Sequence, residues 1–250
     1  MTQDYNYAEC VLQDLGYTPA EASKIINEIK QGNYAFPCKK AKSVGTSKDK
    51  QDVWMQNECT GIDVPVLWAL NQGKRENENI ILLAQDPLRD KDYWDYSQKN
   101  YSQKEMQHDV IVGTPYALHI SEKTKQTLVG DGEKKKAKRY NVGVYRAIIE
   151  QLCKQGYNVY CTDIFKYYML GKPNKNVTEF DVGVFINECK RVNPAKIIAM
   201  GKKAQYAVAE LQIESNRIIS VPHPKARPQR KIADIVGEII TKLKDKEGVK

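Results

Sequence analysis

Histidine is scarce in this chain, and its cysteines lack the spacing of a metal site. The sequence has three histidines and six cysteines, and no two cysteines form a C-x-x-C pair. Structural zinc sites usually use such pairs together with histidine. We therefore expect no bound metal, and we expect the cysteines to be reduced thiols with mostly structural roles.

Long apolar runs are also lacking. No stretch approaches eighteen consecutive apolar residues, the usual minimum for a membrane-spanning helix. The first ten residues, MTQDYNYAEC, have neither the basic start nor the apolar core of a secretory signal. We expect a cytoplasmic protein that does not contact membranes. Its 41% apolar content is enough for a sizeable core.

The charge balance is basic. A formal net charge of +8 over 250 residues favours a polyanionic partner. Lys202 and Lys203 follow a predicted strand, and Lys225 and Arg227 follow His223. These two groups lie next to candidate site residues. A third basic run, at residues 134–139, is interpreted as a solvated loop.

Strand and helix patterns alternate from residue 79 onward. The predicted strands are residues 80–84, 109–112, 158–161, 196–200 and 217–221, and the predicted helices are residues 143–155, 180–192 and 202–211. This alternation predicts an α/β fold with a mostly parallel central sheet flanked by helices.

Residues 1–75 are predicted to form a helical N-terminal extension packed on a main domain of residues 76–250. The sequence Thr18-Pro19-Ala20-Glu21 has the pattern of a capping box with proline at the first helical position. An apolar stripe with helical spacing follows at Ala22, Ile25, Ile26 and Ile29.

Two polar residues follow buried-strand patterns directly. Asp86 comes after the apolar residues 80–84, and His223 comes after residues 218–221; a proline follows each of them. The carboxyl ends of parallel strands meet at one edge of a sheet, where α/β proteins bind ligands. The pair therefore predicts a two-residue active site. The alternative is that Asp86 caps a helix and His223 is an ordinary loop residue.

Five short motifs in order resemble the uracil-DNA glycosylase superfamily. AQDPLR at residues 84–89 resembles the family's GQDPYH, and HPK at 223–225 resembles HPS. Between them lie three further matches: GTPY at 113–116 with G-x-P-F, TDIFK at 162–166 with T-N-x-x-K, and PAKIIAMGKKA at 194–204 with P-x-x-I-x-x-x-G-x-x-A. The resemblance covers residues 79–228 and leaves the N-terminal extension unexplained.

The resemblance implies a monofunctional DNA glycosylase, which hydrolyses the bond between deoxyribose and a flipped-out base. Bond breakage builds positive charge on the sugar and negative charge on the base. Asp86 would stabilise the sugar cation and position water, and His223 would donate a hydrogen bond to the departing base. Neither role needs a cofactor. DNA is the expected partner, and no obligatory protein partner is evident.

The same resemblance implies the binding residues. Gln85, Leu88, Tyr116 and Asp163 would contact the base, with Tyr116 stacking on it; Ile120 takes the stacking position if the insertion shifts the alignment. The residues implied as phosphate contacts are Lys166, Lys202, Lys203, Lys225 and Arg227.

Two departures from the family pattern bear on the substrate. Leu88 stands where the uracil-specific branch has the tyrosine that excludes C5 substituents, and Asp163 replaces the asparagine that reads the base. An ionised aspartate only accepts hydrogen bonds, which suits the amine of cytosine. Together they predict a C5-modified cytosine, hydroxymethylated or glucosylated as in some bacteriophage DNA, and hence a role in defence against phage.

Several alternatives stay open. In the first alternative, Asp163 is displaced or protonated and Leu88 fills the space of the tyrosine. The protein would then be a uracil-DNA glycosylase of base-excision repair. Two other function classes are an inactive DNA-binding module of the same fold and a hydrolase of free nucleosides or nucleotides.

Overall fold

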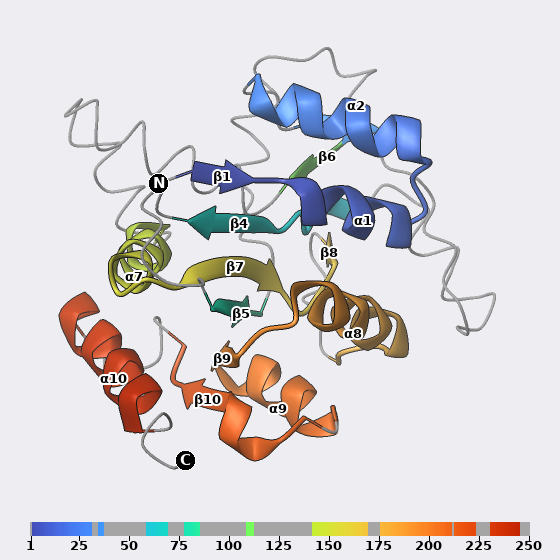
Figure 1. Cartoon of the computed structure of the whole chain (residues 1–250). Helices are drawn as coiled ribbons and strands as arrows, with labels where there is room; N and C mark the ends of the chain where they lie inside the picture. Colours follow the sequence, from blue (N-terminus) through green and yellow to red (C-terminus); the bar gives the residue numbers. More distant parts are fainter. Residues whose placement is uncertain are drawn as a thin grey trace, which may run out of the picture.

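The described part of the chain is an α/β arrangement with two sheets (Figure 1). A six-stranded, mostly parallel mixed sheet lies at its centre, and a four-stranded sheet lies beside it. No helix in the described part is both long and apolar enough to cross a membrane. The computed structural model describes residues 2–31, 35–37, 59–69, 78–85, 109–112, 142–169, 176–211, 213–223 and 231–245.

The central sheet confirms the predicted α/β class with a mostly parallel sheet. Four neighbouring strands pair in parallel, and the two pairings at the other end of the sheet are antiparallel. In spatial order the strands are β1 (Thr2–Asp4), β4 (Val66–Ala69), β7 (Asn158–Asp163), β5 (Asn79–Ala84), β9 (Lys196–Met200) and β10 (Ile218–Val221).

The order in which the chain adds parallel strands to the sheet reverses once. β5 is the first of them in the chain, and β7 pairs with one side of it. β9 pairs with the other side of β5, and β10 follows beyond β9. The order therefore reverses between β5 and β9. In open α/β sheets, the crevice outside the carboxyl ends at such a point is the usual ligand site.

Helices cover both faces of the central sheet. Successive side chains along each strand point to opposite faces, so each strand contributes to both apolar clusters. On β5, Ile80 and Leu82 join the apolar cluster that includes α7 (Val142–Lys154) and α10 (Ile232–Asp245). Ile81 and Leu83 join the opposite cluster, which includes α8 (Glu179–Val192) and α9 (Lys202–Glu210). All four side chains are fully buried. This explains the continuous apolar run that precedes Gln85.

The N-terminal region contains α1 (Asn6–Asp14) and α2 (Pro19–Lys30), joined by a short turn. The predicted capping box is present: Thr18 N–H donates to Glu21 Oε2 at 2.8 Å, and Glu21 N–H donates to Thr18 Oγ1 at 3.4 Å. The predicted apolar stripe of α2 is buried.

Residues 1–75 supply strands as well as helices. β1 and β4 form one edge of the central sheet, and β4 pairs with β7. The pairing of β4 with β7 therefore joins a strand from residues 1–75 to the central sheet. β1 has only three residues and no buried one among them, so no apolar pattern marks it in the sequence.

The smaller sheet contains the predicted strand at residues 109–112. Its order is β2 (Ala35–Pro37), β6 (Asp109–Val112), β3 (Cys59–Ile62) and β8 (Tyr167–Met169). β6 is parallel to β3 and antiparallel to β2. An apolar run predicts a strand but not its partners, so the sequence pattern could not assign β6 to this second sheet. The predicted start of the last strand, Arg217, lies instead in a short 3₁₀ helix, η1 (Ser215–Arg217).

Candidate active site at the carboxyl edge of the central sheet

Several predicted site residues lie at the carboxyl ends of the four parallel strands. Gln85 follows β5, Asp163 ends β7, and His223 lies two residues after β10. Lys202 and Lys203 begin α9, and only Gly201 separates this helix from β9. The structure thus gathers four segments from across the chain at the edge that contains the switch between β5 and β9. Outside the described residues lie Asp86, Leu88, Tyr116, Ile120, Lys225 and Arg227.

Gln85 and the segment after Asp163 are held side by side. Ala84 pairs with Asp163 in the register of β5 and β7. Beyond the strands, Ile164 N–H donates to Ala84 O at 3.0 Å and Phe165 N–H donates to Gln85 O at 3.1 Å. The backbone immediately before Asp86 is therefore tied to the backbone immediately after Asp163.

His223 packs directly on Gly201, the residue that begins the turn from β9 into α9. Gly201 has φ +88°, and a Cβ built on it would lie 3.0 Å from His223 Cβ. Its N–H donates to Val221 O at 2.9 Å, and Gln205 Nε2 donates to the same oxygen at 2.7 Å. Glycine is required here because other residues avoid this φ and because the histidine approaches so closely.

Tyr145 of α7 contacts the candidate catalytic histidine. Its hydroxyl oxygen lies 3.3 Å from His223 Nε2, and both side chains are half-buried. Either group can supply the hydrogen, depending on the histidine tautomer. The sequence analysis did not identify Tyr145, because its position in the helical pattern resembles that of an ordinary core-facing aromatic residue.

The start of α9 makes this edge positive. Lys202 is exposed, and Lys203 Nζ lies 5.0 Å from the centre of the Phe165 ring, within cation–π range. A helix N-terminus adds unpaired N–H groups and the positive end of the helix dipole. These features together suit an anion such as a phosphate.

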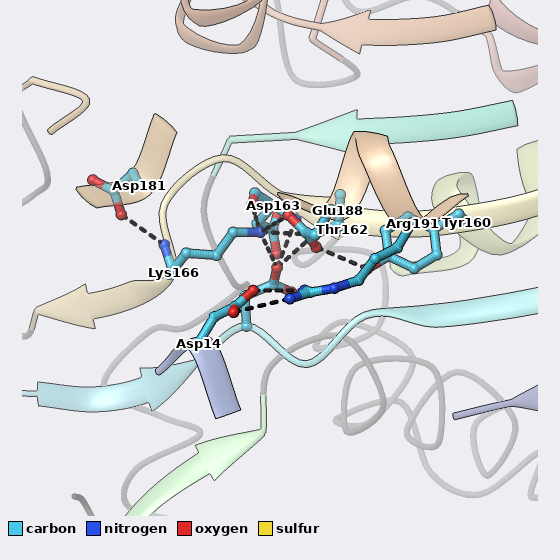
Figure 2. Close-up of polar contacts among 9 residues, drawn as sticks. Asp14, Tyr160, Thr162, Asp163, Lys166, Asp181, Glu188 and Arg191 are labelled. Atoms are coloured by element: carbon cyan, nitrogen blue, oxygen red, sulfur yellow. Dashed lines mark hydrogen bonds and ion pairs between the residues drawn. The ribbon is translucent and has the colours of Figure 1, made fainter. Parts of the chain in front are cut away.

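Lys166 does not fit its expected role as a phosphate contact. Its side chain is fully buried, and Figure 2 shows it pointing toward Thr162, Asp163 and Glu188. Nζ donates to Asp163 O at 2.7 Å, to Asp63 Oδ2 at 2.9 Å and to Thr162 Oγ1 at 2.9 Å. A phosphate contact would break these bonds.

Lys166 is the cation of a buried polar cluster that consists of Asp63, Tyr160, Thr162, Lys166 and Glu188. It pairs with Asp63 Oδ2 at 2.9 Å and with Glu188 Oε2 at 2.7 Å, and all three side chains are inaccessible to solvent. Burial alone would lower the pKa of Lys166, but the two carboxyl groups hold the pKa above its usual value. The lysine is therefore charged.

The contacts of Thr162 with two carboxyl groups are those expected if Glu188 carries a proton. Its Oγ1 lies 2.7 Å from Asp63 Oδ2 and 2.7 Å from Glu188 Oε1. One hydroxyl hydrogen can serve only one of these acceptors. Burial raises the pKa of Glu188, although Lys166 opposes the shift. A protonated Glu188 that donates to Thr162, which in turn donates to Asp63, satisfies both contacts and leaves one cation facing one anion.

Asp63 and Glu188 are polar cluster members that the sequence analysis missed. Asp63 interrupts an apolar run between β3 and β4, and Glu188 lies on the buried stripe of α8 with Val184, Phe185 and Val192. An acidic residue within an apolar stripe is buried only when it has partners. That pattern was visible in the sequence, whereas the identity of the partners was not.

A surface cavity of about 520 Å³ lies elsewhere, beside the amino end of β9. None of the predicted site residues in the described part of the chain lines it. It is formed by Val182, Ile186, Cys189, Lys190, Asn193, Pro194, Ile197, Leu211, Ile213 and Arg217.

No family model matches the chain, and no curated protein matches its sequence. The likeness to the uracil-DNA glycosylase superfamily therefore rests on the five motifs.

Proposed function

We propose that the protein is a DNA glycosylase with a uracil-DNA glycosylase-like fold, which removes a flipped-out base. The main support is that residues from four of the five motifs, which are far apart in the sequence, lie at one edge of the central sheet. Gln85, Asp163, Gly201 and His223 each follow or end a different parallel strand there. This edge also contains the point where the strand order reverses.

The proposed reaction breaks the bond between deoxyribose C1′ and the base nitrogen. The electron pair leaves with the base, a water oxygen bonds to C1′, and the water's proton is released. Asp86, the residue after Gln85, stabilises the positive sugar and orients the water. His223 donates to the base as its negative charge grows. Gly201 and Gln205 support this role because both bond to Val221 O, two residues before His223.

DNA is the proposed partner. The exposed Lys202, the start of α9 and the net charge of +8 all favour a phosphate backbone. A flipped base would enter beside this helix terminus, and unstacking it would cost a few kcal/mol. Contacts to the flanking phosphates would offset that cost.

The proposed base is a C5-modified cytosine. Asp163 is 4% exposed, and its backbone is held on both sides. A buried acceptor of this kind suits the exocyclic amine of cytosine and leaves uracil, which offers a carbonyl there, poorly matched. A leucine at position 88, which is smaller than the family's tyrosine, would leave room for the C5 substituent. Phage DNA containing such bases is the proposed target, with defence as the biological role.

The deciding experiment offers the purified protein a panel of oligonucleotides, single-stranded and duplex. Each contains one cytosine, uracil, hypoxanthine, 5-hydroxymethylcytosine or glucosylated 5-hydroxymethylcytosine. Alkaline cleavage of the resulting abasic sites reports excision, and Asp86→Asn serves as the inactive control. We expect a C5-modified cytosine to be excised much faster than any other base in the panel. Excision of uracil alone would reject the modified-base proposal but keep the glycosylase, and binding without excision would favour an inactive DNA-binding module.

A further inference from the structure

The backbone of Asp163 is anchored on both sides by charged members of the buried cluster, Asp63 and Lys166. Its N–H donates to Asp63 Oδ2 at 3.1 Å. Its carbonyl oxygen accepts from Lys166 Nζ at 2.7 Å (Figure 2). Hydrogen bonds to charged groups are about twice as strong as those between neutral groups. Asp163 is thus fixed by two strong bonds at the end of β7.

Asp63 and Lys166 also hold each other. The Asp63 N–H donates to the Lys166 carbonyl at 2.8 Å, while Lys166 Nζ donates back to Asp63 Oδ2 at 2.9 Å. The Lys166 N–H in turn donates to Asp181 Oδ1 of α8 at 3.1 Å. The segment after β7 is therefore fastened both to the β3–β4 connection and to α8.

We propose that Asp63 and Lys166 are positioning residues that hold Asp163 in the orientation needed to read the base. The proposal rests on the function proposed above, because it assigns a purpose to the orientation of Asp163. Neither residue touches DNA in this scheme. They act through the peptide groups on either side of Asp163, so that its carboxylate is already oriented when the base arrives.

Stability alone is a poor explanation for this arrangement. Replacing a buried ion pair with apolar residues is often neutral or stabilising, so burial of charge is not in itself a gain. Here both charges direct hydrogen bonds to the backbone of one residue at the candidate site. Small errors in the placement of a recognition group lower the rate strongly, which favours such rigid support.

The cluster offers a matched control for the test. Glu188 is equally buried and also pairs with Lys166. Its hydrogen bonds in the described part of the chain are with the hydroxyls of Tyr160 and Thr162, and the Tyr160 hydroxyl is the donor to Oε1. Asp63→Asn weakens the acceptor for the Asp163 N–H, whereas Glu188→Gln alters the same cluster without touching that bond.

The first measurement does not depend on catalysis. Amide hydrogen exchange, followed by ¹⁵N–¹H NMR, should show the Asp163 N–H exchanging about tenfold faster or more in Asp63→Asn, as expected for loss of a charge-assisted bond. Glu188→Gln should leave that rate nearly unchanged. Equal rates in the two variants would overturn the proposal.

The second measurement is base preference. In Asp63→Asn, the ratio of kcat/KM for the modified cytosine to that for uracil should fall about tenfold; in Glu188→Gln it should stay at the wild-type value. An unchanged ratio in Asp63→Asn would also overturn the proposal. If the unmutated protein excises no base, the proposed function fails, and the exchange measurement still decides whether Asp63 anchors Asp163.

If Asp63→Asn does not fold, the double variant Asp63→Asn, Lys166→Met takes its place. It removes both charges together, and buried sites tolerate that better than loss of one partner. Both anchors of Asp163 are then weakened, so faster exchange of its amide and loss of base preference are again expected. A folded double variant that kept wild-type exchange and preference would contradict the proposal.

Discussion

The hydroxyl of Tyr145 lies 3.3 Å from Nε2 of His223. The proposed donor to the departing base therefore already has a partner on α7, which orients the imidazole ring before substrate binds. Because the tyrosine hydroxyl both donates and accepts, it can support either neutral tautomer. This contact leads to the first prediction.

Tyr145→Phe should slow base excision about tenfold by releasing the His223 ring, while His223→Ala should cost about 10²- to 10³-fold, as for loss of one preorganised donor. Single-turnover kinetics with excess enzyme measures both rates. The double variant should be no slower than His223→Ala, because the tyrosine acts through the histidine. Multiplicative losses would show that Tyr145 has a separate role.

Gly201→Ala should impair both folding and activity. The added Cβ would lie 3.0 Å from His223 Cβ at a backbone φ of +88°. We expect a loss of about 1 kcal/mol or more in the free energy of unfolding, measured with urea, and slower excision as His223 is displaced. Gly237→Ala is the control: it lies in α10, and a Cβ there meets nothing within 4 Å. That substitution should be neutral or slightly stabilising.

Asp63→Ala should cost about 3–5 kcal/mol of unfolding free energy because it leaves Lys166 charged and poorly paired. Glu188→Gln should cost much less if Glu188 is already protonated. Urea denaturation at neutral pH measures both changes. Comparable losses from the two substitutions would contradict a protonated Glu188.

The stability difference between the wild type and Glu188→Gln should depend on pH. Burial raises the pKa of Glu188 in the folded protein above its ordinary value of 4.5. The folded state therefore binds this proton more tightly than the unfolded state. The stability that this more tightly bound proton adds to the folded state is fully present below pH 4.5. It is lost as the pH rises through the pKa of Glu188 in the folded protein. The wild type should lose stability relative to Glu188→Gln across that range, and a constant difference would rule out the shift.

DNA binding should weaken with salt, because phosphate contacts release counterions. Replacing Lys202 and Lys203 with glutamine should reduce the slope of log K against log salt concentration by up to about two. Fluorescence anisotropy with labelled DNA at several salt concentrations gives the slope. The control is Lys244→Gln, an exposed lysine in the last turn of α10. An equal change in slope for both variants would count against a specific role for the start of α9.

Asp163→Asn should weaken excision of the modified cytosine and permit some excision of uracil. The asparagine can present an N–H to the uracil carbonyl, while the cytosine amine meets a weaker and less well matched acceptor. The preference between the two bases is measured as the ratio of kcat/KM for the modified cytosine to kcat/KM for uracil. An unchanged ratio would indicate that Asp163 does not read the base.

Local patterns in the sequence predicted much of the framework. The capping box at Thr18 and Glu21 involves residues three apart, and the stripe of α2 repeats with the helical period, so neighbouring residues suffice to recognise them. The buried strand before Gln85 was recognisable from its continuous apolar run. Placing His223 at the carboxyl ends of the parallel strands followed from the rule that parallel strands end together, whereas Gln85 and Asp163 were proposed as neighbours of the site only through the family resemblance.

Interactions between distant residues were decided only by the tertiary structure. The local sequence around Lys166 predicted an accessible cation that contacts phosphate. The side chain is instead buried, because Asp63, 103 residues away in the sequence, pairs with it. His223 and Tyr145 meet across 78 residues, and β6 joins the second sheet through β2 and β3. The sequence alone indicated α2 and most elements from residue 79 onward, because their apolar patterns depend on near neighbours, whereas it did not mark the short strands β1, β2, β3, β4 and β8. Burial, pairing and pKa depend on which distant groups replace water, and that was decided only when the chain had folded.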